Sequence, residues 1–598
     1  MDATAVTADA KAEYSERLRR ARQQQSEHER RQTQLGIAKL TIAAAFVVLL
    51  VWMLKAERGT LVWLAAPALA YIVLDIGHVR ALRKSKRCGQ VIAFYERGIA
   101  RLENRWMGTG EKGDAFLDPA HPYARDLDVF GPGSLFQLLC TARTSAGQEI
   151  LAKWLKHPAA PEEIRDRQAA VAELRPRLDM REELAIFAEG VRSEVRPEAL
   201  TEWGEEAAVL DAGKVQLAGR ILAGAWLASL AVWAVWGRWE VTLLASVVNA
   251  VFYGRIRPQV VKILEAERFE QDLKLLGGAL ELVEREKFSA AKLEKLKAAL
   301  EESGAPPSQC IARVSRMVES LESRRNLIVA VVDPFVLWTA RAAFAIESWR
   351  QRYGSAIRHW LAAVGEMEAL TSLAGYAYEH PTYVFPEMTE GGARFEAEGL
   401  AHPLLAEGQA VRNDLTMGDE LRLAIISGPN MAGKSTFVRA VGINAVLAQC
   451  GAPVRARRLR LSPLQVAASI CVLDSLQGGV SRFYSEITRL KLMASLTEGP
   501  LAVLFLLDEL LSGTNSHDRR IGAEAVVKSL AAKGAVGIVT THDLALTQIV
   551  EGMAQPAANF HFEDRFENGE LHFDYRLEPG IAKSSNALKL MRSIGLEI

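Results

Sequence analysis

Four runs of apolar residues stand out in the first half of the chain, in two pairs, and a short polar segment joins the members of each pair. The runs are Leu40–Leu54, Leu61–Ile76, Ile221–Trp236 and Val241–Tyr253. A helix needs about 20 apolar residues to cross a bilayer, and shorter runs also occur in buried core helices. We interpret the pairs as two transmembrane helical hairpins, at residues 36–78 and 216–257. The alternative for each pair is a helical hairpin buried in a soluble core.

Basic residues follow both hairpins. They are Arg80, Arg83, Lys84, Lys86 and Arg87 after the first hairpin, and Arg255, Arg257 and Lys262 after the second. The cytoplasmic flanks of membrane helices carry an excess of Lys and Arg. Because the turns inside the hairpins are short, both ends of both hairpins are expected to lie in the cytoplasm. The pattern predicts a multi-pass protein of the cell (plasma) membrane.

The other segments of the first two thirds of the chain are expected to be helical. Residues 1–35 carry charges of mixed sign, which is typical of a solvated helix. Residues 259–300 are rich in Leu, Glu, Lys and Ala at helical spacing, and residues 304–307 interrupt them with Gly and Pro. We expect these helices to form the body that connects the hairpins to the rest of the chain.

A glycine-rich loop follows the short apolar run Leu423–Ile426 and leads into a helical pattern. The spacing of Gly, four residues and Gly-Lys-Ser after a strand is that of a phosphate-binding P-loop. Its backbone N–H groups and the start of the next helix would hold a triphosphate. Lys434 would reach the β- and γ-phosphates, and Ser435 would bind Mg²⁺. The candidate nucleotide-binding residues are Gly428, Pro429, Asn430, Met431, Ala432, Gly433, Lys434, Ser435 and Thr436.

Two further apolar strands end in polar residues that complete this chemistry. The run Leu501–Leu507 is typical of a strand buried on both faces of a parallel sheet, and Asp508 and Glu509 follow it. Asp508 would bind Mg²⁺, and Glu509 would act as the general base that activates water. His542 follows a third strand and would contact the γ-phosphate or its water; the alternative is a polar residue at a strand end. The pattern predicts an ATP hydrolase with ATP and Mg²⁺ as cofactors.

Three segments of the C-terminal part resemble the MutS mismatch-repair ATPases. Residues 428–436 resemble that family's GPNMGGKST loop, with Ala432 in place of one glycine. Residues 508–518 are similar to its DEIGRGTSTYDG segment, and residues 481–487 to its STFMVEM segment. The resemblance implies an ABC-like ATPase in which two subunits enclose two ATP molecules, so a homodimer with composite sites is expected. It also implies that Ser481 reaches the nucleotide of the opposite subunit and that Val411 packs on the adenine.

The chain also departs from this family. Mismatch-repair members carry a mismatch-reading domain and a connector domain, and the region before residue 124 is too short for both and holds a hairpin. The second hairpin interrupts the helical region whose family counterpart carries the DNA clamp. We therefore expect a membrane-anchored member that lacks those two domains. Its expected function is an ATP-driven conformational change of a dimer that binds DNA and is related to mismatch repair. The alternative is a membrane ATPase that acts on a protein partner or on the bilayer.

Composition adds little to this interpretation. The chain has 598 residues and a formal net charge of zero, so no overall positive field favours nucleic acid. Five cysteines without metal-ligand spacing are typical of reduced packing residues. The predicted fold is multidomain, with an α-helical core and lever region, two transmembrane hairpins and a C-terminal α/β P-loop domain of the ABC type. The predicted parts are 1–35, a cytoplasmic N-terminal helical segment; 36–78, the first hairpin; 79–123, a linker; 124–215, the first part of the core; 216–257, the second hairpin; 258–385, lever and core helices; and 386–598, the ATPase domain.

Overall fold

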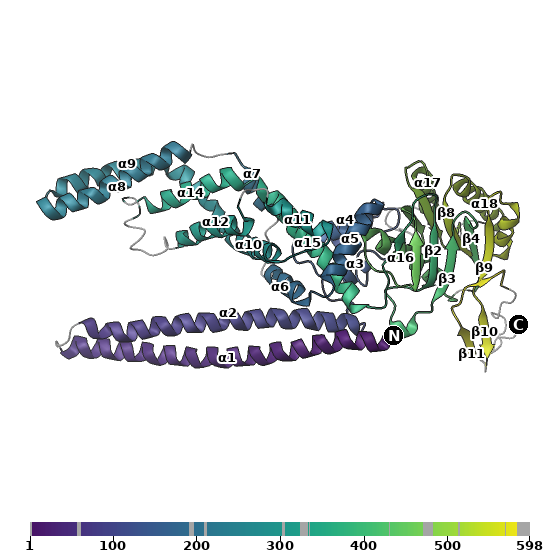
Figure 1. Ribbon diagram of the computed structural model, residues 1–598, viewed down its shortest axis with the longest axis horizontal. Helices are drawn as coiled ribbons and strands as arrows, with labels where there is room; N and C mark the ends of the chain where they lie inside the picture. The colour runs from purple at the N-terminus through teal and green to yellow at the C-terminus, as the bar shows by residue number, and fades with distance from the viewer. Residues whose placement is uncertain are drawn as a thin grey trace. The chain divides into compact units, whose positions relative to one another are not determined.

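The computed structural model (Figure 1) describes most of the chain. The described residues are 3–56, 61–189, 197–207, 212–301, 305–322, 333, 335, 337–429, 431–470, 482–511, 515–567 and 570–582. They form two compact units. The first contains residues 1–110 and 378–382, and the second contains residues 111–377 and 383–598.

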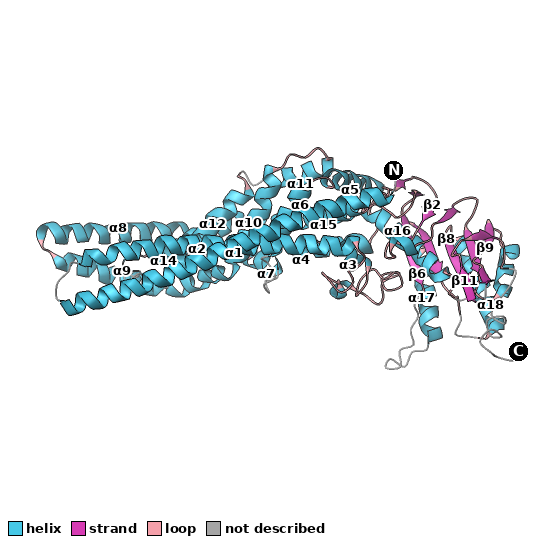
Figure 2. Cartoon of the chain, turned by 90° about the horizontal axis from the view of Figure 1, so that it is seen from below, coloured by secondary structure: helices cyan, strands magenta, loops and turns pink. Residues whose placement is uncertain are grey.

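The first unit is a long helical hairpin. Helix α1 (Ala3–Ala56) and helix α2 (Ala65–Leu102) lie side by side along their length, and a 3₁₀ turn, η1 (Leu61–Leu64), precedes α2 (Figures 1 and 2). Helix α1 crosses the predicted boundary at residue 36 without a break, and α2 continues well into the predicted linker of residues 79–123. Ion pairs one turn apart, such as Arg20–Glu16 at 2.8 Å, support the helix in its charged half.

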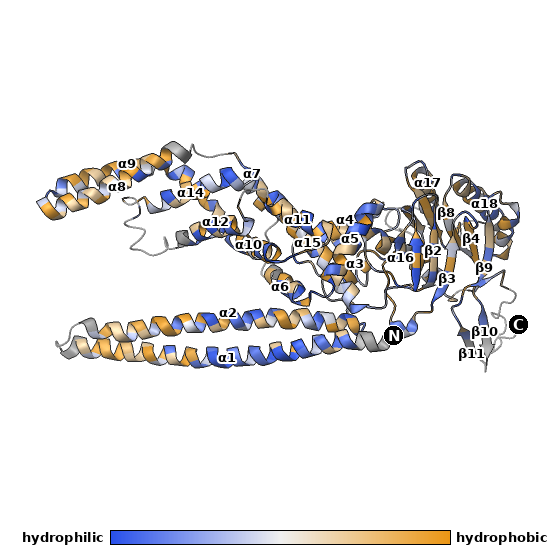
Figure 3. Cartoon of the chain, in the orientation of Figure 1, coloured by the Kyte–Doolittle hydropathy of each residue, from blue (hydrophilic) through white to orange (hydrophobic). Residues whose placement is uncertain are grey.

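The two ends of this hairpin differ in the character of their side chains (Figure 3). At one end Tyr14 is buried, and the Arg101 guanidinium donates to both carboxylate oxygens of Glu379 at 2.6 and 2.7 Å. Toward the turn the surface is apolar, and the side chain of Leu40 is 73% exposed. An ion pair between Lys39 and Asp75 lies where the charged half meets the apolar half.

The second unit begins with a helical body. Its helices are η2 (Asp114–Phe116), α3 (Leu135–Leu139), α4 (Ser145–Lys156), α5 (Pro161–Leu174), α6 (Leu178–Glu189), α7 (Pro197–Glu205), α8 (Ala212–Trp236), α9 (Trp239–Ile263), η3 (Leu264–Phe269), α10 (Glu270–Arg285), α11 (Ala291–Glu301), α12 (Pro307–Glu322), α14 (Trp338–Tyr353) and α15 (Ala356–Glu379), whose last two residues belong to the first unit. Pro161 and Pro307 start their helices, where a proline loses no hydrogen bond. The predicted interruption at residues 304–307 therefore separates α11 from α12.

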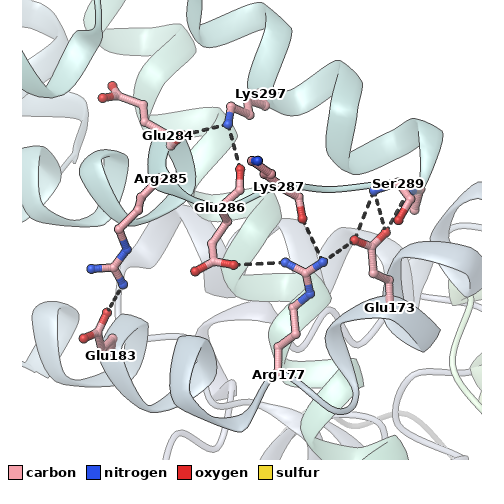
Figure 4. Close-up of polar contacts among 10 residues, drawn as sticks. Glu173, Arg177, Glu183, Glu284, Arg285, Glu286, Lys287, Ser289 and Lys297 are labelled. Atoms are coloured by element: carbon pink, nitrogen blue, oxygen red, sulfur yellow. Dashed lines mark hydrogen bonds and ion pairs between the residues drawn. The ribbon is translucent and has the colours of Figure 1, made fainter.

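A polar network joins the parts of the body that precede and follow the α8–α9 hairpin (Figure 4). The Glu173 carboxylate of α5 accepts hydrogen bonds from the N–H groups of Ser289 and Ala290 at 3.1 and 2.6 Å, next to the start of α11. Arg177 donates to Glu173 at 2.6 Å and to Glu286 at 3.0 Å. The segments predicted as the first and second parts of the core thus form one helical body.

The α8–α9 hairpin is polar inside and apolar outside. The indole N–H of Trp226 donates to Ser246 Oγ at 2.8 Å, and Thr242 Oγ1 donates to the Ser229 carbonyl at 3.0 Å. Asn249, which is buried, donates to the Leu222 carbonyl at 3.4 Å. Many large apolar side chains of the hairpin are exposed, and they include Leu227, Trp233, Val235, Trp236, Trp239, Leu243, Leu244, Val247, Val248 and Val251. This distribution is the reverse of that in a water-soluble helical pair.

Three helices among the described residues are long and apolar enough to cross a membrane. The candidate segments are 9–53 in α1, 65–102 in α2 and 215–236 in α8. Helix α9 does not meet the same criterion, although its predicted span was the partner of α8. Its apolar run, Val241–Tyr253, is short, and Arg255 and Arg257 follow it. The prediction of four spans is therefore matched by three candidates.

A buried carboxyl group links α15 to the start of α4. Glu368 accepts hydrogen bonds from the Thr144 hydroxyl and from the N–H of Arg143 at 3.1 Å. Burial raises the pKa of Glu368 to about 7 in spite of these donors. Because the folded pKa lies above the ordinary 4.5, the protonated carboxyl contributes stability that is fully present below pH 4.5 and is lost as the pH rises through 7.

Glu368→Gln is expected to remove this pH dependence. The free energy of unfolding of the wild type should fall relative to that of the variant by up to about 3 kcal/mol between pH 5 and pH 8. Urea denaturation of the purified proteins at several pH values measures the difference, and other titrating groups cancel in it. A difference that stays constant across this range would contradict the raised pKa.

The rest of the second unit is the C-terminal α/β domain, which holds the strands (Figure 2). In the described residues six strands form a sheet in the order β12-β9-β4-β8-β7-β6. Strands β4, β6, β7, β8 and β9 are parallel, and β12 is antiparallel to β9. A second sheet has the order β1-β5-β2-β3, and β10 pairs with β11. The strand bounds are β1 Glu387–Met388, β2 Phe395–Leu400, β3 Asn413–Met417, β4 Leu423–Ser427, β5 Arg458–Leu461, β6 Leu464–Ser469, β7 Ala502–Leu507, β8 Val536–Thr541, β9 Ala557–His561, β10 Asp564–Glu567, β11 Glu570–Phe573 and β12 Glu578–Pro579.

The three predicted strands are confirmed as neighbours in the middle of the large sheet. Strand β8 lies between β4 and β7, and all residues of β4 and β8 are buried. A Cβ atom at Gly537 of β8 would lie only 2.3 Å from the Phe505 ring of β7, so this close packing requires a glycine. The helices and 3₁₀ turns of the domain are η5 (Glu407–Gln409), α16 (Lys434–Cys450), α17 (Arg482–Leu496), α18 (Ser516–Ala532) and η6 (Leu544–Gly552).

Candidate nucleotide-binding site

A cleft of about 760 Å³ lies at the carboxyl ends of the parallel strands. Strand β4 leads into the glycine-rich loop, and β7 leads into Asp508 and Glu509. Ligands of open α/β sheets bind at this edge. The cleft is lined by Leu400, Ala401, His402, Leu405, Gly408, Gln409, Ala410, Val411, Asn413, Met431, Gly433, Lys434, Ser435, Thr436, Phe437, Ala440, Glu509, Phe562 and Tyr575.

The loop has the backbone that its glycines predict. Gly428 has φ +147° and Gly433 has φ +98°, values that disfavour any side chain. A Cβ at Gly428 would lie 2.6 Å from the Phe562 carbonyl oxygen, and one at Gly433 would lie 2.9 Å from the Tyr575 ring. Ala432 is buried and is not among the residues with positive φ, so an alanine fits where the family loop has a glycine. Asn430 lies outside the described residues.

Lys434 is the first residue of α16 and lies against the loop. Its Nζ donates to the carbonyls of Gly428 at 2.7 Å and Pro429 at 2.8 Å. Burial lowers the pKa of Lys434, and the nearby carboxylates of Glu509 and Asp508 oppose the shift. Ser435 and Thr436 follow at the helix start and line the cleft, and Met431 has an exposed side chain at its rim. The loop therefore has room for phosphates and a cation to hold them.

A threonine that the sequence analysis did not single out holds the acidic pair in place. Thr540 Oγ1, at the end of β8, donates to the Asp508 carboxylate and accepts from the Glu509 N–H at 3.1 Å. Glu509 itself has φ +49°, an unusual backbone conformation that marks a constrained turn. His542 Nδ1 lies 3.6 Å from Glu509 Oε1. The two predicted carboxylates and the predicted histidine thus lie close together, and Glu509 lines the cleft.

If Asp508 binds Mg²⁺ as the sequence predicts, Thr540→Val should weaken this binding, because it removes the hydroxyl that bonds Asp508 while keeping the shape of the side chain. We expect the Mg²⁺ concentration for half-maximal ATP hydrolysis to rise about 10-fold or more, as is usual for a lost partner of a metal ligand. Thr540→Ser retains the hydroxyl and should stay close to the wild type. A Mg²⁺ titration of the three proteins measures this, and equal behaviour of the Ser and Val variants would refute the role.

Apolar and aromatic side chains also line the cleft. Val411, predicted to contact adenine, lines it together with the P-loop residues, as does Tyr575. Asn413 fixes the segment around Tyr575, since its Nδ2 donates to the Tyr575 carbonyl at 3.0 Å and its Oδ1 accepts from the Leu577 N–H at 2.8 Å. Burial lowers the pKa of His402 to about 4, so this histidine is neutral in the cleft at pH 7. No local sequence signal pointed to Tyr575, which lies more than 100 residues beyond the P-loop.

The segment predicted to contact a second subunit leads into α17. Ser481 lies outside the described residues, and α17 begins at the next residue. Within α17 the buried Glu486 carboxylate accepts the N–H of Leu511 at 2.5 Å. Leu511 follows the acidic pair of β7 by two residues and has φ +54°. This bond ties the start of α17 to the turn that carries Glu509.

A buried ion pair connects α17 to the start of the second unit. Asp126 is fully buried, and its carboxylate pairs with Arg489 of α17 and accepts the Ile470 N–H at 2.8 Å. Arg439 of α16 donates to the Asp126 carbonyl at 3.0 Å. The segment around residue 126 therefore contacts both α16 and α17.

Comparison with known proteins gives the following matches. Residues 424–597 match the family described as MutS domain V. The chain is 32% identical to the DNA mismatch repair protein MutS 2 of Halobacterium salinarum over 253 residues, which are 41% of this chain and 29% of that protein. It is 29% identical to the DNA mismatch repair protein MutS of Thermus aquaticus over 567 residues, 86% of this chain and 66% of that protein. Endonuclease MutS2 of Thermus thermophilus is 32% identical over 213 residues, 34% of this chain and 27% of that protein. The chain thus spans less than two thirds of each of these relatives, and the matches confirm the resemblance found in its motifs.

Proposed function

Because residues 424–597 match MutS domain V, we propose that the chain is a MutS-type, Mg²⁺-dependent ATPase held at a membrane by its apolar hairpins. The observation that carries the proposal is the cleft, which Lys434 of the P-loop and Glu509 line together, with His542 3.6 Å from the Glu509 carboxylate. Lys434 binds the β- and γ-phosphates, Ser435 and Asp508 hold Mg²⁺, and Glu509 activates the attacking water. Mg²⁺, when bound, neutralises charge on the phosphates.

The two P-loop glycines, Gly428 and Gly433, support the binding of a nucleotide in the cleft. Side chains at Gly428 and Gly433 would occupy space next to Phe562 and Tyr575, so the loop keeps its backbone N–H groups open to phosphate oxygens. Val411 and Tyr575 then flank the base. His542 orients Glu509 or contacts the γ-phosphate. In a homodimer, Ser481 of each subunit completes the site of the other, and closure of the two domains on ATP is the conformational change that the protein performs.

The α8–α9 hairpin supports the membrane assignment. Polar side chains such as Asn249 and Thr242 bond between or along the helices, whereas the surface is apolar. Buried polar contacts with an apolar exterior suit helices surrounded by lipid. The α1–α2 hairpin also exposes apolar side chains toward its turn, and the basic residues Arg80 and Arg83 follow its second apolar run. With both hairpin ends in the cytoplasm, the ATPase domain faces cytoplasmic ATP at the plasma membrane.

Lys434→Ala tests the nucleotide site directly. The lost cation–phosphate bonds should weaken ATP binding about 10- to 100-fold. Equilibrium binding of a fluorescent ATP analogue to the detergent-purified protein measures the affinity, and Lys533→Ala, at an exposed lysine of the same domain, is the control. Wild-type affinity in Lys434→Ala would refute the assignment.

DNA binding is a second candidate, and the alignment with the Thermus aquaticus mismatch repair protein over 86% of the chain favours it. If the helical body clamps DNA, affinity should fall steeply as salt rises, because phosphate contacts release counterions. Titration of duplex DNA at several salt concentrations measures this. Absence of salt-dependent binding would leave the alternative, in which ATP drives a change in the bilayer or in a protein partner.

A further inference from the structure

A second, smaller pocket lies at the base of the α8–α9 hairpin, between helices α8, α12 and α14. Its volume is about 260 Å³. Gln216 and Arg220 of α8 line one side, Met317 of α12 another, and Trp338 and Arg341 of α14 a third. This volume lies below the range of pockets that hold drug-sized ligands, so it suits a small group rather than a whole cofactor.

The pocket carries positive charge without a counter-charge. Arg220 and Arg341 both line it, and no carboxylate does so among the described residues. Neither guanidinium forms an ion pair with a described residue. The neighbouring Arg350 of α14, by contrast, is buried and pairs with Glu347 at 2.9 Å. Two arginines that share a pocket and lack a carboxylate partner favour an anion with several oxygens, because a guanidinium bonds phosphate through two parallel N–H groups.

The position of the pocket along α8 indicates where this anion comes from. Arg220 directly precedes the apolar run, and the flanking Leu217 and Ile221 are 59% and 62% exposed. Trp338, at the start of α14, is half exposed beside the two arginines. An arginine pair with a tryptophan at the end of an apolar helix is the arrangement expected at the headgroup level of a bilayer.

We propose that this pocket binds the phosphate of an anionic phospholipid headgroup, through Arg220 and Arg341. The inference rests on the proposed insertion of the α8–α9 hairpin into the membrane. A bound headgroup would hold α8 against α14, the helix that leads through α15 to the ATPase domain. The lipid would therefore fix the hairpin on the body of the protein rather than only attract it to the surface.

The test compares two pairs of arginines at the same end of the hairpin. The pocket variant, Arg220→Gln/Arg341→Gln, removes both positive charges from the pocket. The control variant, Arg255→Gln/Arg257→Gln, removes two positive charges from exposed positions of α9 that do not line the pocket. The full-length proteins, in phosphatidylcholine nanodiscs, are titrated with phosphatidylglycerol while bound lipid is counted by native mass spectrometry. The pocket variant should bind phosphatidylglycerol about 10- to 30-fold more weakly than the wild type, and the control variant less than threefold.

Other outcomes would overturn the proposal. Equal losses in both variants would mean that the whole basic surface, and no pocket, attracts the lipid. Competition by millimolar inorganic phosphate as effective as that by phosphatidylglycerol would mean that a soluble phosphate is the ligand. Arg220→Lys/Arg341→Lys, which keeps the charge, should recover part of the affinity if the glutamine variant is folded. If the protein fails to float with vesicles of any composition, the membrane proposal itself fails; if it floats and shows no preference for phosphatidylglycerol, only the pocket inference fails.

Discussion

Glu509→Gln is expected to bind ATP with wild-type affinity and to hydrolyse it at least about 100-fold more slowly, as is usual when a general base is removed. The amide has nearly the shape of the carboxylate but cannot accept a proton from water. Glu509 lines the cleft opposite the P-loop, and His542 lies 3.6 Å from its carboxylate. Because ATP would bind and persist, the variant should also accumulate as an ATP-bound dimer.

Phosphate release and size-exclusion chromatography with light scattering, each with and without ATP, measure the two effects. Glu498→Gln, at an exposed glutamate of the same domain, makes the same chemical change away from the cleft and should behave as the wild type. If Glu509→Gln turned over ATP at the wild-type rate, another group would have to be the base. A variant that stays monomeric with ATP bound would contradict the composite site.

Asp126→Ala should lower the free energy of unfolding by about 3–5 kcal/mol, the usual cost of removing one partner from a buried ion pair. Asp126 is fully buried, and the change would leave Arg489 without its carboxylate and Ile470 N–H without its acceptor. Since Arg489 lies on α17, the loss should also loosen the helix that carries Glu486. Urea denaturation of the detergent-solubilised protein measures the stability.

The neighbouring Asp128 offers a matched control for this change. It lies two residues away, is half exposed, and is 3.8 Å from Arg439. Its φ of +50° is a value that asparagine tolerates, so Asp128→Asn should cost no more than about 1 kcal/mol. Asp126→Asn keeps an acceptor for the Ile470 N–H and should lie between the two. Similar stabilities for Asp126→Ala and Asp128→Asn would show that the buried pair contributes little.

Local sequence patterns predicted the central strands of the large sheet and the loops that follow them. The runs before Gly428 and Asp508 are continuous and apolar, and such runs form strands in the centre of a parallel sheet. Their ends meet because β4, β8 and β7 are neighbours. Spacing and the apolar runs therefore predicted the P-loop, the acidic pair and His542, and in the structure Glu509 lines the cleft with P-loop residues while His542 lies 3.6 Å from it.

The remaining parts depend on contacts between distant residues. The sequence around Thr540 gives no sign of a functional role. The contact of its hydroxyl with Asp508 follows only from the register of β7 and β8. The Tyr575 ring lies beside Gly433, and a hydrogen bond from Asn413, which is distant in sequence, holds the Tyr575 backbone there. No helix boundary lies at the expected position, residue 36. The backbone hydrogen bonds of a helix are the same whether its side chains are polar or apolar, so a change from polar to apolar side chains need not end the helix. Helix α9 shows a second limit of the sequence. A run of 13 apolar residues is compatible both with a buried core helix and with a membrane span.

The bonds between Glu173 and the start of α11 join residues 116 and 117 positions apart. During synthesis α5 leaves the ribosome long before Ser289 and Ala290 exist, and everything between them, including α8 and α9, must emerge first. The helical body therefore cannot close around a finished α5 until α8 and α9 have been synthesised. If the α8–α9 hairpin enters a membrane as proposed, the order of translation would let it do so before the helical body that supports it is complete.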